Sequence, residues 1–358
     1  MKTNRGLSGF LLSGLAAGAA FGYVRHQRRK RMNGEDPFFG RLALVMGGSR
    51  GLGFLLAREF AREGARVAIA ARDPSELERA VNALRTEGGE VTVRACDVTD
   101  RSRVEELIRE LEREEGPIDV LVNNAGVITV GPVETMTVED YESSLAVMFW
   151  GMVYATLAVL PHMVRRQRGR IVNVTSIGGR VSVPHLNSYC AAKFAAQGFS
   201  EGLRAELGRY GVRVTSVLPG IMRTGGHVNA QFKGQHEDEY RWFAGASSLP
   251  GVALDAEKAA RRIVRAVRRG DADYVVGVPA KLLAFLHGVA PGLTADASGA
   301  LGRALLPHSM PAQQTLLGKQ LERRKHSLIW KALTTLGRES VSRFQEHRGV
   351  GANGAALP

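Results

Sequence analysis

The chain has 358 residues, of which 44% are hydrophobic and 23% are charged, a balance typical of a globular protein with a substantial core. Its formal net charge of +13 gathers at the two ends: residues 1–41 carry +6 and residues 311–358 carry +5, which leaves +2 for the middle. A nucleic-acid-binding domain carries its basic patch on the folded unit, so this charge distribution excludes nucleic acid as a partner. It favours binding of the two basic ends to anionic lipid head groups, and the alternative is that both ends are solvated tails.

An uncharged run of 18 residues, Leu7–Val24, is followed directly by the basic sequence RHQRRKR. As a helix this run spans about 27 Å, the short end of what crosses a hydrocarbon core of roughly 30 Å. The positive-inside rule then leaves everything after Arg25 in the cytoplasm. We therefore expect residues 1–32 to form an uncleaved membrane anchor with a basic flank. A cleaved signal peptide and an interfacial or buried helix are the alternatives.

Residues 33–40 are predicted to be a linker, and strands then alternate with helices up to about residue 280. A long apolar helix is predicted from Val138 to Met163, with Thr137 and Asp140 spaced as a capping box. The apolar strands are predicted at 41–46, 66–71, 90–95, 118–126, 170–176, 212–220 and 273–277. Near-continuous apolar strands between helices indicate an α/β fold, a Rossmann-like doubly wound parallel sheet of about seven strands with helices on both faces.

Residues 281–358 are predicted to be a basic, amphipathic C-terminal extension. Its helices could pack on the core, join a partner subunit or lie on a membrane. The two cysteines, Cys96 and Cys190, provide neither a disulfide framework nor the spacing of a metal site. We therefore expect no metal and a reducing compartment.

A glycine-rich loop, GGSRGLG at residues 47–53, follows the first strand and opens a helix. In this context Gly47, Gly51 and Gly53 allow a tight turn and a close approach to a pyrophosphate, which the helix N-terminus favours. A carboxylate at the tip of the second strand would select NAD, but Ala71 and Arg72 stand there. Arg50 and Arg72 together favour the 2′-phosphate of NADP, although Asp73 lies close.

These features, taken in order, resemble the short-chain dehydrogenase/reductase (SDR) family over residues 41–280. The resemblance rests on the glycine loop, CDVTD (96–100), NNAG (123–126), a serine thirteen residues before a Tyr-x-x-x-Lys motif, and PG (219–220). The resemblance implies that Tyr189 is the general acid or base and that Lys193 lowers the pKa of its phenol from about 10. It also implies that Ser176 orients and polarises the carbonyl.

The same resemblance implies a set of residues that contact the cofactor. The glycine loop would hold the pyrophosphate, the residues after the second and third strands the adenosine, and the remaining ones the nicotinamide and its ribose. The set is Gly47, Ser49, Arg50, Gly51, Leu52, Gly53, Arg72, Asp97, Val98, Asn123, Ala125, Gly126, Tyr189, Lys193, Pro219, Gly220 and Thr224.

Two departures from the family stand out. Met46 occupies the place of a threonine before the first loop glycine, and Met148 that of an asparagine that holds a water of the proton relay. Methionine cannot take over either hydrogen bond. The sequence therefore leaves three hypotheses: an anchored NADP(H)-dependent enzyme, a soluble NAD-linked alcohol dehydrogenase, and a catalytically silent NADP-binding scaffold.

The loops expected to hold the substrate, 127–136 and 177–186, are largely apolar, and residues 221–250 are predicted to be a lid. We therefore expect a small lipophilic carbonyl or alcohol substrate, a membrane-associated protein with its catalytic domain in the cytoplasm, and a homodimer or homotetramer.

Overall fold

The computed structural model describes residues 37–249, 251–307, 314–322 and 334–346. The expected membrane anchor, its basic flank and half of the expected linker lie outside the described residues. Phe38, which the sequence assigns to the linker, is fully buried and meets Phe60 edge to face, with ring centroids 5.1 Å apart. Phe38 therefore packs in the same hydrophobic cluster as α2, at the end of the expected linker.

The main sheet confirms the predicted Rossmann-like fold. Within the described residues it has seven strands in the order β11-β7-β6-β4-β1-β2-β3, and all its pairings are parallel. The strands are β1 (Leu42–Met46), β2 (Arg66–Ala71), β3 (Val91–Ala95), β4 (Ile118–Asn123), β6 (Gly169–Val174), β7 (Val212–Pro219) and β11 (Asp273–Val276).

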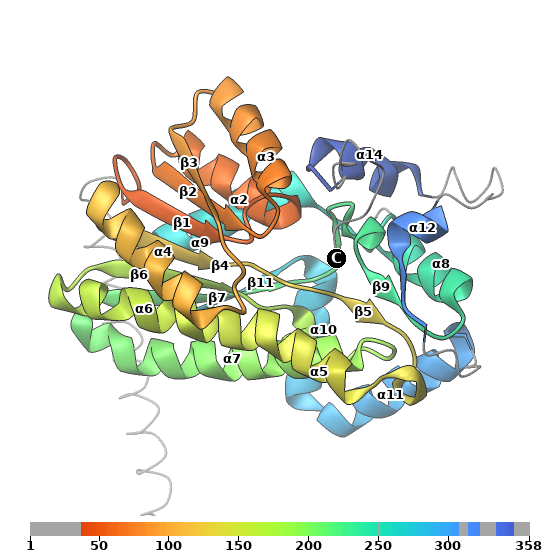
Figure 1. The fold of residues 1–358 in the computed structure, drawn as a ribbon. Helices are drawn as coiled ribbons and strands as arrows, with labels where there is room; N and C mark the ends of the chain where they lie inside the picture. Colours follow the sequence, from red (N-terminus) through yellow and green to blue (C-terminus); the bar gives the residue numbers. More distant parts are fainter. Residues whose placement is uncertain (1–36, 250, 308–313, 323–333, 347–358) are drawn as a thin grey trace, which may run out of the picture. The chain divides into compact units, whose positions relative to one another are not determined.

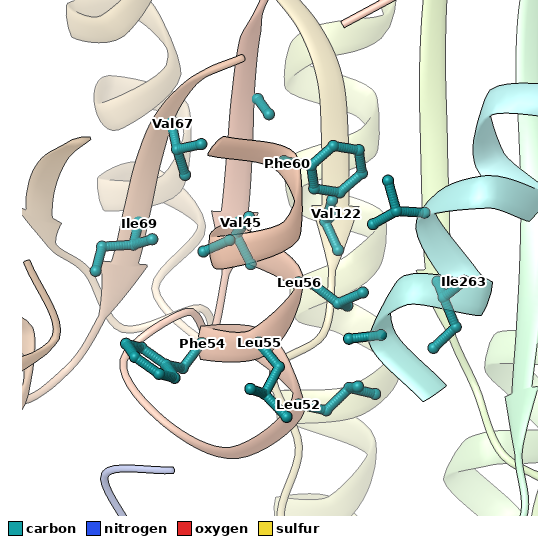
Figure 2. Packing of buried hydrophobic residues seen from close by; sticks show 14 of the residues in the cluster. Val45, Leu52, Phe54, Leu55, Leu56, Phe60, Val67, Ile69, Val122 and Ile263 are labelled. Carbon is teal, nitrogen blue, oxygen red and sulfur yellow. The ribbon is translucent and has the colours of Figure 1, made fainter. Parts of the chain in front are cut away.

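Two hydrophobic clusters cover the two faces of this sheet. Along β1, Ala43 and Val45 belong to one cluster and Leu42, Leu44 and Met46 to the other, as the two-residue period of a strand requires. Figure 2 shows Val45 packed beside the helix that follows β1. The first face is covered by α2 (Gly51–Arg62), α3 (Pro74–Thr86) and α9 (Ala256–Arg269), the second by α4 (Arg101–Glu114), α6 (Gly151–Arg165) and α7 (Asn187–Leu207).

The predicted long helix is interrupted. It consists of α5 (Val138–Leu145), a π-helical turn over Ala146–Trp150, and α6. The predicted capping box is present, with the Thr137 amide donating to Asp140 Oδ2 at 2.8 Å. By length and composition alone Val138–Arg165 could cross a membrane, but its Val159 and Met163 side chains pack in the core of this fold. A π turn widens the helix by one residue, and such turns occur often at functional sites.

The expected lid is ordered and carries its own elements. It contains β8 (Met222–Arg223), β9 (Gln231–Phe232) and α8 (His236–Ala246), and β8 pairs with β10 (Leu254–Asp255). The strand β9 pairs with β5 (Thr129–Val130) and with β12 (Leu316–Leu317), so the lid joins the rest of the fold through a small three-stranded sheet. Short 3-10 turns lie at Val133–Thr135, Ile177–Gly179, Gly208–Tyr210 and Gly226–Val228.

The described part of the C-terminal extension begins with a helical hairpin, α10 (Val278–Val289) and α11 (Pro291–Leu305). It continues with β12, α12 (Gly318–Glu322) and α14 (Thr335–Arg343). Through β12 and α14 the extension contacts the catalytic unit directly, since β12 pairs with β9 and Phe344 is buried in the cluster that also contains α2. In Figure 1, α8, α12 and α14 are drawn at the same end of the sheet.

Candidate active site

The strand order reverses between β1 and β4, and the two loops that leave their carboxyl ends meet there. The Asn124 side-chain amide donates to the Gly47 carbonyl at 2.9 Å, and its backbone amide donates to the Met46 carbonyl at 3.1 Å. Gly47 has φ +75°, and a Cβ on it would lie 2.7 Å from Ala125 Cα. The predicted glycine loop and NNAG motif therefore lie together at the topological switch point, where open α/β sheets bind ligands.

The glycine loop has the close approaches that the motif predicts. A Cβ on Gly53 would lie 1.9 Å from the Gly47 carbonyl oxygen, so no other residue fits there. Leu52 is buried, and α2 has no acidic residue in its first turn. No acid of α2 itself offsets the positive end of this helix, and a helix N-terminus of this kind suits the pyrophosphate of a dinucleotide.

The three expected catalytic residues lie around the carboxyl end of β6. Ser176 directly precedes the Ile177–Gly179 turn and accepts a hydrogen bond from the Gly178 amide at 3.0 Å. Tyr189 and Lys193 come from the first turns of α7. The Lys193 ammonium lies 5.8 Å from the Tyr189 ring centroid and donates to the Val174 carbonyl at 2.8 Å.

The electrostatics of this group differ from what the family resemblance implies. Burial raises the pKa of Tyr189 to about 12, although a hydrogen bond with Ser176 acts in the opposite direction. Burial also lowers the pKa of Lys193 to about 8. For Tyr189, burial outweighs the hydrogen bond with Ser176, and the Lys193 ammonium donates its proton to the Val174 carbonyl. The Tyr189 phenol stays protonated at neutral pH and is ready to act as an acid.

The two methionines that replace family residues line one small cavity. Met46 and Met148 border a space of about 10 Å³ together with Val98, Asn123, Ala125, Val147, Gly151 and Met152. Met148 lies in the π turn and is almost completely buried. A Cβ on Gly126 would lie 3.7 Å from its sulfur, so the thioether packs against the NNAG turn. The two departures are thus neighbours in space, and apolar packing replaces both hydrogen bonds of the family.

Asn123 ends β4 with its side chain turned inward. Its amide donates to Thr156 Oγ1 at 3.1 Å and to Asn173 Oδ1 at 2.9 Å, while its own Oδ1 is buried without a hydrogen bond. Asn173 in turn donates to Ser200 Oγ at 3.0 Å, and Ser200 pairs with Ser216. The side chain of this expected cofactor residue therefore belongs to a buried polar network beneath the site.

At the expected adenosine end, Arg72 and Asp97 are both partly exposed and lie 3.9 Å apart. Asp97 also accepts hydrogen bonds from the amide and hydroxyl of Thr99, and Val98 is buried next to Gly151. Asp73 caps α3 by accepting from the amides of Ser75 and Glu76. Burial alone would raise the Asp73 pKa, but these hydrogen bonds lower it, so its carboxylate is committed to the helix and not to a ribose.

Arg50 is held by two acids that the sequence gives no reason to single out. Its guanidinium lies 2.5 Å from Glu346 and 3.5 Å from Glu76, and Ser49 Oγ donates to the same Glu76 carboxylate at 2.9 Å. Burial by itself would lower the Arg50 pKa, but these carboxylates raise it. Glu346 is 296 residues from Arg50 in the sequence, and no local motif predicts their contact.

The expected nicotinamide end follows β7. Pro219 is the last residue of β7, and Gly220 donates from its amide to the Val276 carbonyl at 3.1 Å. Thr224 lies farther along, where its hydroxyl accepts from the Gly226 amide at 3.3 Å. A Cβ on Gly51 would come within 3.9 Å of Thr224 Cβ, so this loop closes against the glycine loop.

The substrate side of Tyr189 is apolar. Tyr189 packs against a hydrophobic cluster whose further members include Ile128, Val183, Trp242 and Phe243 from the predicted substrate loops and the lid. A buried carboxylate underlies it: Glu239 on α8 lies 2.8 Å from His185 Nδ1 and accepts from Trp242 Nε1 at 2.7 Å. The lid is therefore fastened to the loop before Tyr189, and Tyr189 packs against apolar side chains.

Comparisons with known proteins agree with this geometry. Residues 41–233, more than half of the chain, match the family model described as short chain dehydrogenase. The dehydrogenase/reductase SDR family protein 7-like of Drosophila melanogaster is 31% identical over 272 residues, which are 75% of this chain and 82% of that protein. The 3-ketodihydrosphingosine reductase of Bacteroides thetaiotaomicron is 34% identical over 201 residues, 55% of this chain and 71% of that protein. A variant of actinorhodin polyketide ketoreductase solved with NADPH has a TM-score of 0.58 and 29% identity, over 66% of this chain and 96% of that one.

Proposed function

The chain belongs to the short-chain dehydrogenase/reductase family and is an NAD(P)-dependent oxidoreductase of alcohol or carbonyl groups; within that activity, we propose that it reduces a lipophilic aldehyde or ketone with NADPH, or catalyses the reverse oxidation. The observation that carries this proposal is the Tyr189 phenol, protonated at neutral pH and facing an apolar cluster. A protonated acid packed against apolar side chains suits the reduction of an apolar carbonyl.

The bound dinucleotide would supply the hydride that adds to the carbonyl carbon. Tyr189 gives its proton to the carbonyl oxygen, so an alcohol and the oxidised cofactor result. The Ser176 hydroxyl, held by the Gly178 amide, orients that oxygen. Lys193, anchored on Val174, keeps a positive charge behind the phenol and stabilises the phenolate that forms when the proton leaves.

For the cofactor we propose NADP(H) in preference to NAD(H). Arg72 is half exposed and has only a loose partner in Asp97, so its guanidinium is available to a 2′-phosphate. Asp73, the carboxylate that could bind ribose hydroxyls instead, is committed to capping α3. The solved relative with NADPH supports the same choice.

For the location we propose a membrane-associated enzyme with its catalytic domain in the cytoplasm, anchored through residues 7–24. The hairpin α10–α11 supports a lipid-facing side, because large apolar side chains such as Phe285, Leu293 and Leu305 are about two-thirds or more exposed on it. The Bacteroides relative, named as a reductase of a sphingoid ketone, supports a long-chain substrate. We further propose a homodimer or homotetramer, for which Trp150, Leu157 and Phe194 offer exposed apolar surface near α6 and α7.

The proposal is tested by assaying the purified protein with aldehydes and ketones of increasing chain length, each with NADPH and with NADH. We expect activity that rises with chain length and is higher with NADPH. Activity confined to short polar carbonyls would contradict the substrate class, and better use of NADH would support the soluble NAD-linked alternative.

A second candidate function is a silent cofactor-binding scaffold, and the burial of Met148 in place of the relay asparagine favours it. Such a protein would bind NADPH with ordinary affinity and consume none with any carbonyl. Titrating NADPH fluorescence alongside the turnover assay separates the two candidates.

A further inference from the structure

The pyrophosphate end of the proposed cofactor site is occupied by the protein's own C-terminal region. We call residues 335–346, which comprise α14 and the three residues after it, the C-terminal strap. The amide of Gly51, at the start of α2, donates to the Phe344 carbonyl at 2.8 Å. The Glu346 carboxylate also lies against Gly51, because a Cβ on Gly51 would be only 2.5 Å from Glu346 Oε1. The anion-binding N-terminus of α2 therefore already has an acceptor and a negative charge.

Residues that are expected to bind the cofactor surround this carboxylate. Arg50 is ion-paired to Glu346 Oε2 at 2.5 Å, and Gly51 and Thr224 face each other at the same place. Outside the expected cofactor set, Asn229 donates to Glu346 twice, to the backbone oxygen at 2.8 Å and to Oε2 at 2.7 Å. Glu346 is 4% exposed, so it is enclosed as a bound ligand would be.

The strap is attached at its base and strained at its tip. Phe344 and Val341 are buried, Arg343 is ion-paired to Glu257 at 3.0 Å, and a Cβ on Gly225 would lie 2.7 Å from the Val341 backbone. Gln345, between the anchored part and Glu346, has φ +62°, a left-handed conformation that costs energy for any residue other than glycine. The anchoring contacts therefore lie at residues 341–344, and the left-handed Gln345 separates them from Glu346.

We propose that the strap is an internal competitor of the dinucleotide, in which the Glu346 carboxylate takes the position of a pyrophosphate oxygen and must leave before the cofactor binds. This inference rests on the proposed function, since it needs a dinucleotide at the glycine loop. Two negative groups cannot share Arg50 and the α2 N-terminus, so closed strap and bound cofactor exclude each other. The apparent affinity for NADPH is then reduced by the fraction of molecules whose strap is closed.

The test compares NADPH binding by the full-length protein and three variants, measured by fluorescence titration. Glu346→Gln removes the charge and keeps the shape, and should lower the NADPH dissociation constant by about tenfold or more. Asn229→Ala removes one clamp and should lower it by about threefold. Glu339→Gln is the matched control, because Glu339 is an exposed acid on the same helix, and it should change nothing.

Hydrogen exchange of the wild-type protein provides a readout that needs no variant. Saturating NADPH should speed exchange in a peptide covering residues 341–346, because the Glu346 amide, which donates to the Val341 carbonyl, is released. Slower exchange there, or a weaker affinity of Glu346→Gln, would show that the strap closes over bound cofactor, and an unchanged affinity would show that Glu346 does not compete with it. Each of these results would overturn this proposal and leave the proposed function standing. If neither the wild type nor any variant bound NADPH or NADH, the proposed function would fail together with the strap.

Discussion

The two ends of the proposed cofactor site are built in different ways. The catalytic end is local: Ser176, Tyr189 and Lys193 lie within 18 residues of each other around one strand and one helix. The pyrophosphate end joins Arg50 and Gly51 to Glu346 across nearly the whole chain. The residues that set turnover and the residues that set cofactor affinity therefore lie in separate regions. A substitution in one region should leave the quantity that the other region sets nearly unchanged.

The largest effect should come from the catalytic end. Lys193→Met removes the buried ammonium beside Tyr189, and we expect turnover to fall by about 10²–10⁴-fold, the range typical of general acid–base groups. NADPH affinity should change much less than turnover. Steady-state rates and fluorescence titration on the same samples measure both; an equal loss of binding and turnover would contradict the separation of the two ends.

The same substitution should stabilise the fold by about 1–3 kcal/mol, because burial lowers the pKa of Lys193 from 10.5 to about 8. Below pH 8 the lysine is charged in both states, and the folded protein bears the full cost of a buried charge. Between pH 8 and 10.5 only the unfolded chain holds the proton, so wild-type stability rises with pH. The advantage of Lys193→Met should thus be largest below pH 8 and shrink above it. Urea unfolding at pH 7 and pH 10 measures it, and an advantage that grew with pH would contradict the sign.

The fold and the catalytic end follow from the sequence because their signals are short-range. The strands of the sheet are short, near-continuous apolar runs between helices, and the spacing from Ser176 to Tyr189 and Lys193 survives any error of a few residues in the element bounds. The π turn at Met148 did not follow, since an apolar helix gives no sign of where one residue is inserted. The pairing of Arg50 with Glu346 did not follow either, because contacts between distant segments leave no local pattern.

Substitutions of the two methionines, Met46 and Met148, test whether their side chains share one site. Because Met46 and Met148 share one cavity, Met148→Asn alone places an amide against a thioether and should cost about 1–3 kcal/mol of stability. Adding Met46→Thr supplies a polar neighbour and should recover part of that loss, with a coupling energy of about 0.5–3 kcal/mol. Turnover of the double variant should equal or exceed that of wild type. A double-mutant cycle in thermal or urea unfolding measures the coupling, and strictly additive losses would contradict a shared site.

An effect of similar size concerns cofactor choice. Arg72→Ala should weaken NADPH binding by about 1–3 kcal/mol, the range of a charged hydrogen bond, and leave NADH binding nearly unchanged. Arg265→Ala, which removes an exposed arginine of α9, is the control. If both cofactors lost affinity equally, Arg72 would not read the 2′-phosphate, and the preference for NADP would lack its main support.

The most direct test of the central claim is the consumption of NADPH in the presence of a long-chain aldehyde, compared between wild type and Tyr189→Phe. The two proteins should bind NADPH alike, because the substitution removes only the hydroxyl. We predict carbonyl-dependent consumption by the wild type and a rate at least about 10²-fold lower for Tyr189→Phe. Equal rates, or no consumption by either protein despite bound NADPH, would contradict the account and leave the scaffold as the better explanation.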